Sequence, residues 1–267
     1  MERKIIFFDI DGTLISGGSH KIPESAINAI KKARENGHVC IINTGRTKAM
    51  VGEELTGQVE FDGILMGCGT MIEYHGVELF HHTFPKELSE RILEGLERHH
   101  IDALLEGVTA IYNPGVQNLH TKTFYNYVVN LETRYPLRPF SEAIGNYDKF
   151  FSYVDHRENM EHFAEEFSEE LDFIDRENGF YEVVPKGFSK AGGMEYLANW
   201  LNISMDHTVA IGDSNNDIPM FECSGTGIAM EKSSADILAM ADHVTTDVQQ
   251  DGIRNALQWL GVLEKAK

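Results

Sequence analysis

Short apolar runs alternate with amphipathic stretches along the first part of the chain. Lys4–Phe8 is an apolar run that predicts a buried strand, and Pro23–Asn36 carries its apolar residues at helical spacing. His38–Ile42 and Gly63–Met66 are two further apolar runs, each short enough for a strand. Strands that alternate with helices in this way favour a parallel sheet with helices on both faces, the doubly wound α/β class.

The same alternation returns after residue 185. Ser189–Leu201 predicts a helix, and Thr208–Ile211 predicts a buried strand that ends in a polar cluster. The other elements expected in this part are a strand around Ile228, a helix over Ser234–Ala241, a strand over His243–Thr245 and a final helix over Gly252–Leu260. The two ends of the chain therefore read as one discontinuous core domain, residues 1–83 and 186–267.

Residues 84–185 have a different character and read as an inserted α+β domain. Before them, Met71–Phe80 resembles a hairpin that turns at His75-Gly76. The insertion is rich in aromatic residues, which we interpret mainly as core. Its expected helices lie near Lys86–His99, His120–Leu131 and Glu158–Glu170, and its expected strands near Val108–Tyr112, Phe150–Val154 and Phe180–Val184.

Composition and charge exclude several classes of partner. The 267 residues carry a formal net charge of −19, which disfavours nucleic acids and anionic membranes as partners. Cys40, Cys68 and Cys223 show no spacing typical of disulfides or zinc sites. No apolar run is long enough to span a bilayer, and the run near the N-terminus is too short for a signal peptide, so we expect a cytoplasmic protein.

Polar clusters stand where three of the predicted strands end. Because ligands of open α/β sheets bind beyond the carboxyl ends of the strands, one sheet edge is expected to gather these clusters. Each has a plain structural alternative as a strand exit or a helix cap, but three such clusters together favour a site. The clusters are Asp9 and Asp11, then Thr44, Gly45 and Arg46, then Asp213, Asn216 and Asp217.

Such a carboxylate cluster suits Mg²⁺ and phosphoryl transfer. Hard oxygen ligands with room for water match the preference of Mg²⁺, whose charge would let a phosphate approach an aspartate. Asp9 could then act as nucleophile, and Asp11 as the acid that protonates the leaving group and the base that activates water. Thr44 offers a hydroxyl and Gly45 a backbone N–H to phosphate oxygens, and Lys190 offers a positive charge.

The motifs also resemble a known family. The segments DIDGT (9–13), INTGR (42–46), Lys190 and GDSNND (212–217) resemble, in order, the four motifs of the haloacid dehalogenase superfamily, and most closely its Cof-type phosphatases of subfamily IIB. The resemblance implies a Rossmann-like core, and the long interval between Thr44 and Lys190 places an inserted type IIB cap there. The fold class we expect is therefore α/β with this cap.

The resemblance implies a role for each matching residue. Asp9 matches the nucleophile and a metal ligand, Asp11 the acid/base and a ligand through its backbone carbonyl, and Asp213 the third ligand. The positions implied to contact substrate or phosphate are Ile10 through its backbone N–H, Thr44, Gly45, Lys190 and Asn216, and Asp217 is implied to organise the metal site. Arg46 has two equal interpretations, binding of the substrate or pairing with a carboxylate.

One position departs from the family pattern, because Cys68 stands where the family often has Asn. We favour a packed side chain there. The expected activity is Mg²⁺-dependent hydrolysis of a small phosphorylated metabolite, either a sugar phosphate or a phosphorylated cofactor, by a monomer or homodimer. The alternatives are a phosphotransferase or mutase on the same scaffold, and a ligand-binding regulatory module with little turnover.

Overall fold

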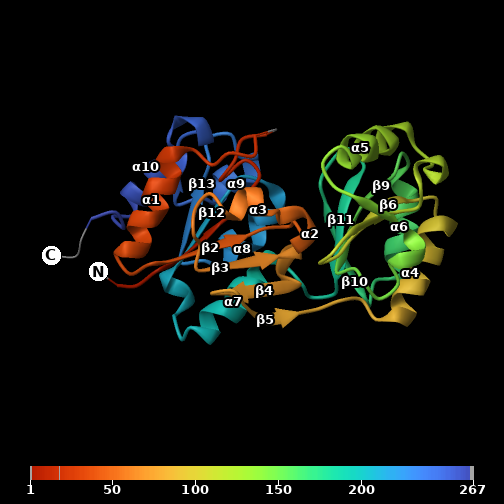
Figure 1. Cartoon of the computed structure of the whole chain (residues 1–267), viewed down its shortest axis with the longest axis horizontal. Helices are drawn as coiled ribbons and strands as arrows, with labels where there is room; N and C mark the ends of the chain where they lie inside the picture. Colours follow the sequence, from red (N-terminus) through yellow and green to blue (C-terminus); the bar gives the residue numbers. More distant parts are fainter. Residues whose placement is uncertain (1, 18, 265–267) are drawn as a thin grey trace. The chain divides into compact units, whose positions relative to one another are not determined.

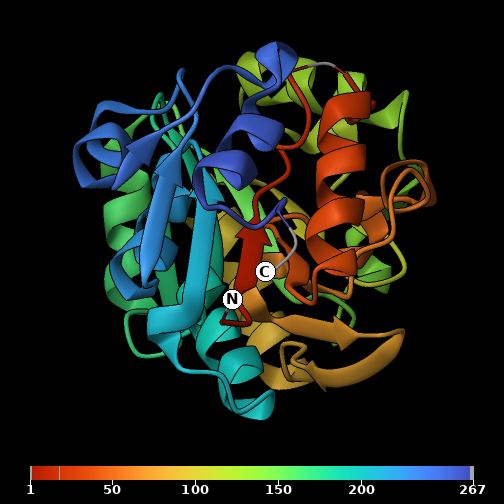
Figure 2. The same cartoon turned by 90° about the vertical axis from the view of Figure 1, so that its left-hand side faces the viewer.

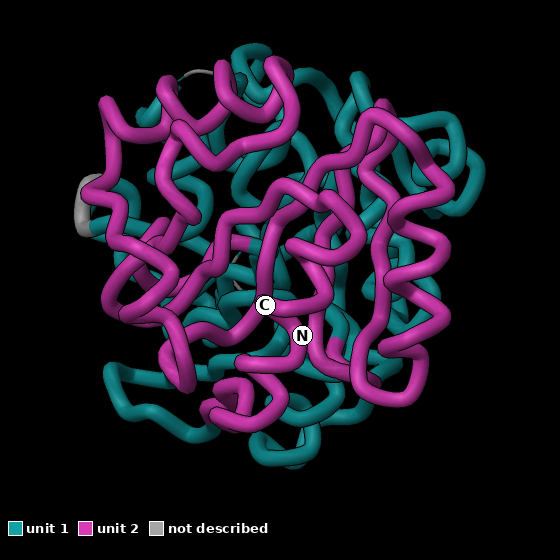
Figure 3. The backbone as a smooth tube through the Cα atoms, turned by 90° about the vertical axis from the view of Figure 1, so that its right-hand side faces the viewer, with its two compact units in different colours: residues 1–45, 51–80, 189–267 teal, residues 46–50, 81–188 magenta. Residues whose placement is uncertain are grey.

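The computed structural model describes residues 2–17 and 19–264, which divide into two compact units (Figure 3). Unit 1 contains residues 1–45, 51–80 and 189–267, and unit 2 contains residues 46–50 and 81–188. Within the described residues, no helix is both long and apolar enough to cross a membrane. The domain boundaries expected at 83/84 and 185/186 stay a prediction.

Unit 1 is built on an eight-stranded sheet of order β14-β13-β12-β1-β2-β3-β4-β5. The strands from β14 to β3 pair in parallel, and β4 pairs antiparallel with β3. Figure 2 shows β1, in red, in the middle of this sheet. The strands are β1 Ile5–Phe8, β2 Val39–Asn43, β3 Gly63–Met66, β4 Met71–Tyr74, β5 Val77–His81, β12 Thr208–Gly212, β13 Thr226–Ala229 and β14 His243–Val244.

Helices cover both faces of this sheet, as the alternating pattern predicted. Ile6 and Phe8 of β1 pack into the core formed with α1 and α10, which lie side by side in Figure 1. Ile5 and Phe7 pack into the opposite core, formed with α7, α8 and α9. The helices of unit 1 are α1 Glu24–Glu35, α3 Glu53–Thr56, α7 Lys190–Trp200, α8 Ile218–Cys223, α9 Ala235–Met240 and α10 Gly252–Trp259, and a short helix, α2 Lys48–Val51, spans the boundary of the two units.

Unit 2 is an α+β structure with a six-stranded sheet of order β10-β11-β9-β6-β7-β8. Its neighbouring strands pair antiparallel except β7 and β8, which are parallel. The strands are β6 Asp102–Glu106, β7 Ile111–Asn113, β8 Leu137–Pro139, β9 Lys149–Tyr153, β10 Leu171–Asp175 and β11 Phe180–Pro185, and the helices are α4 Lys86–Arg98, α5 Lys122–Glu132 and α6 Arg157–Glu166.

Each face of the unit 2 sheet has its own core. On one face, Phe150 of β9 packs with Ile92 of α4 and Phe163 of α6. On the other face, Leu104 of β6 packs with Phe124 and other residues of α5. Because successive strand residues point to opposite faces, the two cores divide the side chains of each strand between them.

Three strands of unit 2, β6, β8 and β10, were not expected from the sequence. β6, Asp102–Glu106, consists largely of good helix formers between two acidic residues, so its pattern did not indicate a strand. The helix expected over Glu158–Glu170 ends at Glu166, and β10, Leu171–Asp175, follows it. For β6, pairing with β7 and β9 overrides the local preference of the segment.

Candidate active site

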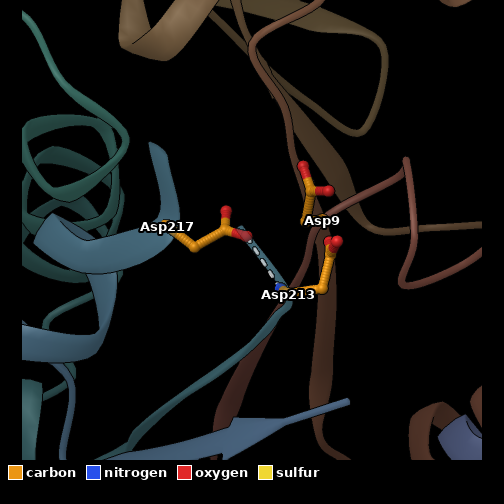
Figure 4. Close-up of side chains that lie close together, drawn as sticks. All are labelled: Asp9, Asp213 and Asp217. Carbon is orange, nitrogen blue, oxygen red and sulfur yellow. Dashed lines mark hydrogen bonds between the residues drawn. The ribbon is translucent and has the colours of Figure 1, made fainter. Parts of the chain in front are cut away.

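Three carboxylates converge at the carboxyl ends of two neighbouring strands. Asp9 follows β1 and Asp213 follows β12, and the two strands pair in parallel with Phe8 opposite Ile211. Each of Asp9, Asp213 and Asp217 offers a carboxylate oxygen, and these three atoms lie within 4.8 Å of one another (Figure 4). The structure therefore brings together residues more than 200 positions apart in the sequence, and the group can hold a metal ion.

Lys190 lies between two of these carboxylates. It is the first residue of α7, and the Oγ of Ser189 caps that helix by accepting from Gly192 N at 3.1 Å. Its Nζ donates to Asp9 Oδ1 at 2.5 Å and to Asp217 Oδ1 at 2.6 Å, and the residue is 1% exposed. Burial alone would lower the pKa of Lys190, but the two carboxylates raise it overall, so the side chain stays charged.

Asp217 is held with both oxygens occupied. Its Oδ2 accepts from Asp213 N at 2.9 Å and from Ser214 N at 3.1 Å, while Oδ1 accepts from Lys190. Asn216 is largely buried beside it, and its Oδ1 accepts from Ser214 Oγ at 2.7 Å. The arrangement suits Asp217 to orient the loop and Lys190 rather than to bind a metal directly.

Asp9 and Asp213 form the electrostatic centre of the site. Burial, opposed by Lys190 and reinforced by Asp217 and Asp11, raises the pKa of Asp9 to about 7. Burial and the charge of Asp9 raise the pKa of Asp213 to about 8. Both shifts have the same physical cause. Burial and the neighbouring carboxylates disfavour the charged form of each side chain, and the positive charge of Lys190 offsets this only in part.

The loop after β1 contributes two residues, Gly12 and Thr13, that lie outside the predicted list of site residues, although a tight turn was expected at Gly12. Gly12 has φ +88°, and a Cβ placed there would collide with the carboxylate of Asp213. Thr13 Oγ1 donates to Asp213 Oδ1 at 3.2 Å. Both belong to the DIDGT segment, where a glycine directly after Asp11 was the available signal for a close approach of the backbone to another residue.

Thr44 and Gly45 follow β2, and backbone hydrogen bonds connect Thr44 to the end of β3 and to the turn after it. Thr44 is buried, its N donates to Leu65 O at 2.9 Å, and its O accepts from Cys68 N at 3.1 Å. Cys68 is buried and has φ +56°, in the left-handed region where Asn and Gly are common. Asn43, also without a role in the sequence analysis, donates from Nδ2 to Lys190 O at 3.1 Å and so ties β2 to the start of α7.

The remaining predicted site residues differ in their exposure. The side chain of Asp11 is exposed, and Ile10 is buried, with its carbonyl accepting from Leu14 N and Ile15 N at 3.0 Å each. Arg46 belongs to unit 2, where its NH1 donates to Met50 O at 3.5 Å and its charge acts on Glu106. For Arg46, both alternatives of the sequence analysis stay open.

Comparison with known proteins identifies what this arrangement resembles. The family model of haloacid dehalogenase-like hydrolases matches residues 6–257. The chain is 28% identical to the 5-amino-6-(5-phospho-D-ribitylamino)uracil phosphatase YcsE of Bacillus subtilis, over 97% of this chain and 96% of that protein. It is 27% identical to the pyridoxal phosphate phosphatase YbhA of Escherichia coli, over 95% and 97% of the two chains.

A solved structure supports the same assignment. The subclass IIB sugar phosphatase BT4131 is 25% identical to this chain, matches 97% of it and 99% of its own length, and superposes with a TM-score of 0.82. The match over nearly all of both chains includes the insertion as well as the core, so the expected combination of a Rossmann-like core with a type IIB cap is confirmed.

Proposed function

The chain belongs to the haloacid dehalogenase-like hydrolases and is a phosphatase, and on that premise we propose that it transfers the phosphoryl group of a small phosphomonoester first to Asp9 and then to water. The observation that carries the proposal is the environment of Asp9. Lys190 holds its Oδ1, while among the described residues nothing donates a hydrogen bond to its Oδ2. One oxygen is thus fixed and the other is available for attack.

The other predicted residues supply the supporting chemistry. Asp11, with its exposed side chain, would protonate the leaving oxygen and later deprotonate the attacking water. Thr44, the Gly45 and Ile10 backbone N–H groups and Asn216 would bind the phosphate oxygens, and Lys190 would stabilise their charge. This assignment of roles follows the family resemblance, and the clustering of Asp9, Lys190 and Asp213 supports it.

We infer that the metal is Mg²⁺, because the available ligands are hard carboxylate oxygens without His or Cys. The carboxylates of Asp9 and Asp213 would hold it together with the backbone carbonyl of Asp11, and Asp217 would keep Asp213 in place through the Asp213 backbone N–H. Burial and neighbouring carboxylates raise the pKa values of Asp9 and Asp213, and bound Mg²⁺ would favour their ionised forms and lower the repulsion of a phosphate dianion.

The substrate is a small phosphorylated metabolite, a class that includes the compounds named for YcsE and YbhA. We infer that the inserted unit acts as a cap that selects the alcohol part of the substrate. Uniformly poor turnover across a panel of phosphometabolites would instead favour a ligand-binding module.

Replacement of Asp9 by Asn tests the proposal directly. Asp9→Asn should lower kcat for p-nitrophenyl phosphate by at least about 10³-fold, since an amide is a poor nucleophile. Asp11→Asn should allow a phosphoryl group to accumulate on Asp9, seen as added mass on the peptide that contains this residue. Asp62→Asn is the control, because within the described part of the chain the Asp62 carboxylate accepts from Arg34 and from the Cys40 backbone N–H, which belong to no predicted site residue. Full activity of Asp9→Asn would refute the nucleophile assignment.

A further inference from the structure

Strand β2 ends in a polar side chain that is fully enclosed. Asn43 is 0% exposed, and the residues before it in β2 are hydrophobic and buried. β2 lies between β1 and β3, so strands pair with it on both sides. Ile41 packs into the core formed with α7 and α8, and Asn43 points the same way because side chains alternate along a strand. A polar group in this place must form hydrogen bonds or destabilise the fold.

The two ends of the Asn43 amide differ in their contacts. Asn43 Nδ2 donates to the backbone carbonyl of Lys190 at 3.1 Å and lies 3.7 Å from Met220 Sδ, a weak acceptor. Among the described residues, no group donates to Asn43 Oδ1. A buried acceptor without a donor costs free energy, and a leucine of similar shape would have no such acceptor. The bond to Lys190 is therefore the specific interaction that an asparagine provides here.

The carbonyl that Asn43 contacts belongs to the residue that holds Asp9. Lys190 Nζ donates to the carboxylates of Asp9 and Asp217, which lie close together in Figure 4. Lys190 is thus bonded at both ends, through its ammonium to the two carboxylates and through its carbonyl to Asn43. Because a lysine side chain is long and flexible, a fixed backbone limits where its ammonium can lie.

A second contact acts on the start of α7. Gly69 has φ +90°, and a Cβ there would lie 2.6 Å from the carbonyl oxygen of Ser189, the residue that caps this helix. Hydrogen bonds within a helix fix its internal geometry but not its position against a sheet. The bond from Asn43 and the close approach of Gly69 both hold the first turn of α7 from outside. Only the bond from Asn43 is made by a side chain, so a substitution can remove it.

We propose that Asn43 is a positioning residue for phosphoryl transfer, which acts through the Lys190 backbone to keep the Lys190 ammonium against Asp9. This inference rests on the proposed function. Asn43 has no proposed contact with the substrate, and its effect passes through Lys190 to the nucleophile. Without the bond from Asn43, the first turn of α7 can shift, and a displacement of about 1 Å in an active site can lower the rate about 10²-fold.

The variant Asn43→Leu removes the donor and the unpaired acceptor together. The value of kcat for p-nitrophenyl phosphate at saturating Mg²⁺ should fall about 10- to 100-fold. KM should change less than about threefold, because Thr44 and Gly45, which are proposed to bind the phosphate, are unchanged. The urea midpoint should stay the same or rise, because leucine leaves no polar atom unpaired. A side chain with only a structural role would give the opposite pattern, a lower midpoint with an unchanged kcat.

Two further measurements keep the test independent of how well leucine fits. Asn43→Ala removes the same donor and occupies less space, so it should lose a similar factor in kcat even if leucine prevents folding. A crystal structure of the variant with the lower kcat should show Lys190 Nζ more than about 3.5 Å from the Asp9 carboxylate, beyond hydrogen-bond distance.

The matched control is Thr245→Val. Thr245 is 4% exposed, and its hydroxyl donates at 2.7 Å to the carbonyl of Gly252, the first residue of α10. The control therefore removes the same kind of bond, from a buried side chain to the first carbonyl of a helix, but α10 contains no predicted site residue. It should leave kcat and KM unchanged while the urea midpoint falls.

The outcomes separate this inference from the proposed function. If Asn43→Leu and Asn43→Ala keep kcat within about twofold of the wild type, or if Thr245→Val loses as much kcat as they do, the inference is overturned while the function stands. If the wild type and Asp9→Asn hydrolyse p-nitrophenyl phosphate equally well, the proposed function itself is overturned, and the inference with it.

Discussion

At the residue scale, the single side chain of Lys190 neutralises part of the buried negative charge of the site. A buried ammonium is unfavourable by itself, and so are the buried carboxylates of Asp9 and Asp217. Each carboxylate lies within 2.6 Å of the Lys190 ammonium, so the opposite charges offset one another's desolvation. The trio is therefore both a structural unit and, in our proposal, the part of the site that keeps Asp9 oriented.

Removal of the Lys190 charge should be costly. Lys190→Met leaves two buried carboxylates without a counter-charge, and we expect about 3–5 kcal/mol less free energy of unfolding in urea at pH 7 with EDTA present. The control is Lys32→Met, which removes an exposed ion pair with Glu35 and should cost less than about 0.5 kcal/mol. Similar small losses in both variants would contradict this account of Lys190.

At the scale of elements, the site depends on how strands end. β1 and β12 are neighbours in parallel, so the turns that follow them meet at one edge of the sheet. The turn after β1 approaches Asp213 so closely that only a glycine fits at position 12. Helix α7, capped by Ser189, then brings Lys190 to the same edge.

Gly12→Ala separates backbone strain from the displacement of Asp213. We expect a loss of about 1–3 kcal/mol in stability from the positive φ and a fall in kcat of at least about tenfold, because the new Cβ pushes the Asp213 carboxylate away. Gly37→Ala is the control, since Gly37 has φ +93° but open space around it. Urea unfolding and p-nitrophenyl phosphate kinetics measure both. If the two variants lose activity equally, displacement of Asp213 has no part in the effect.

At the scale of the whole molecule, the site couples protons, metal and stability. Asp9 and Asp213 have pKa values raised from 3.8 to about 7 and about 8. Between these values and 3.8, the folded protein holds protons that the unfolded chain has released. Without metal, the stability that these bound protons contribute is therefore lost as the pH rises from about 4 to about 8.

Metal should reverse this dependence. With EDTA, the free energy of unfolding should fall between pH 7 and 8.5, a range above the usual histidine pKa. Mg²⁺ at a hundred times its Kd should add about 2.7 kcal/mol, and at fixed Mg²⁺ the gain should be larger at pH 8.5, where protons compete less. Asp213→Asn should weaken both effects. The four conditions are EDTA or Mg²⁺, each at pH 7 and at pH 8.5. A wild-type protein with the same urea midpoint under all four would refute the coupling of metal binding to the protonation of these two carboxylates.

Local sequence accounts for much of the core. The burial of β1, β2, β3 and β12 can be predicted without knowledge of the strands they pair with, because each run is too apolar to remain in water. The pairs Asp9 with Asp11 and Asp213 with Asp217 follow such strands, and the family resemblance carried by these motifs is confirmed. Unit 2 was less predictable, since β6 is a strand mainly because β7 and β9 pair with it.

Sequence by itself determined that Asp9, Thr44, Lys190 and Asp213 stand at the ends of their elements, since hydrophobic pattern and capping are local properties. The tertiary structure decided what those residues touch. Only parallel pairing of β1 with β12 brings Asp9 and Asp213 together, and only then do burial and mutual repulsion raise their pKa values. The buried residues Glu106, Lys149 and Glu182 of unit 2 meet for the same reason, because they come from three strands whose order no local pattern contains.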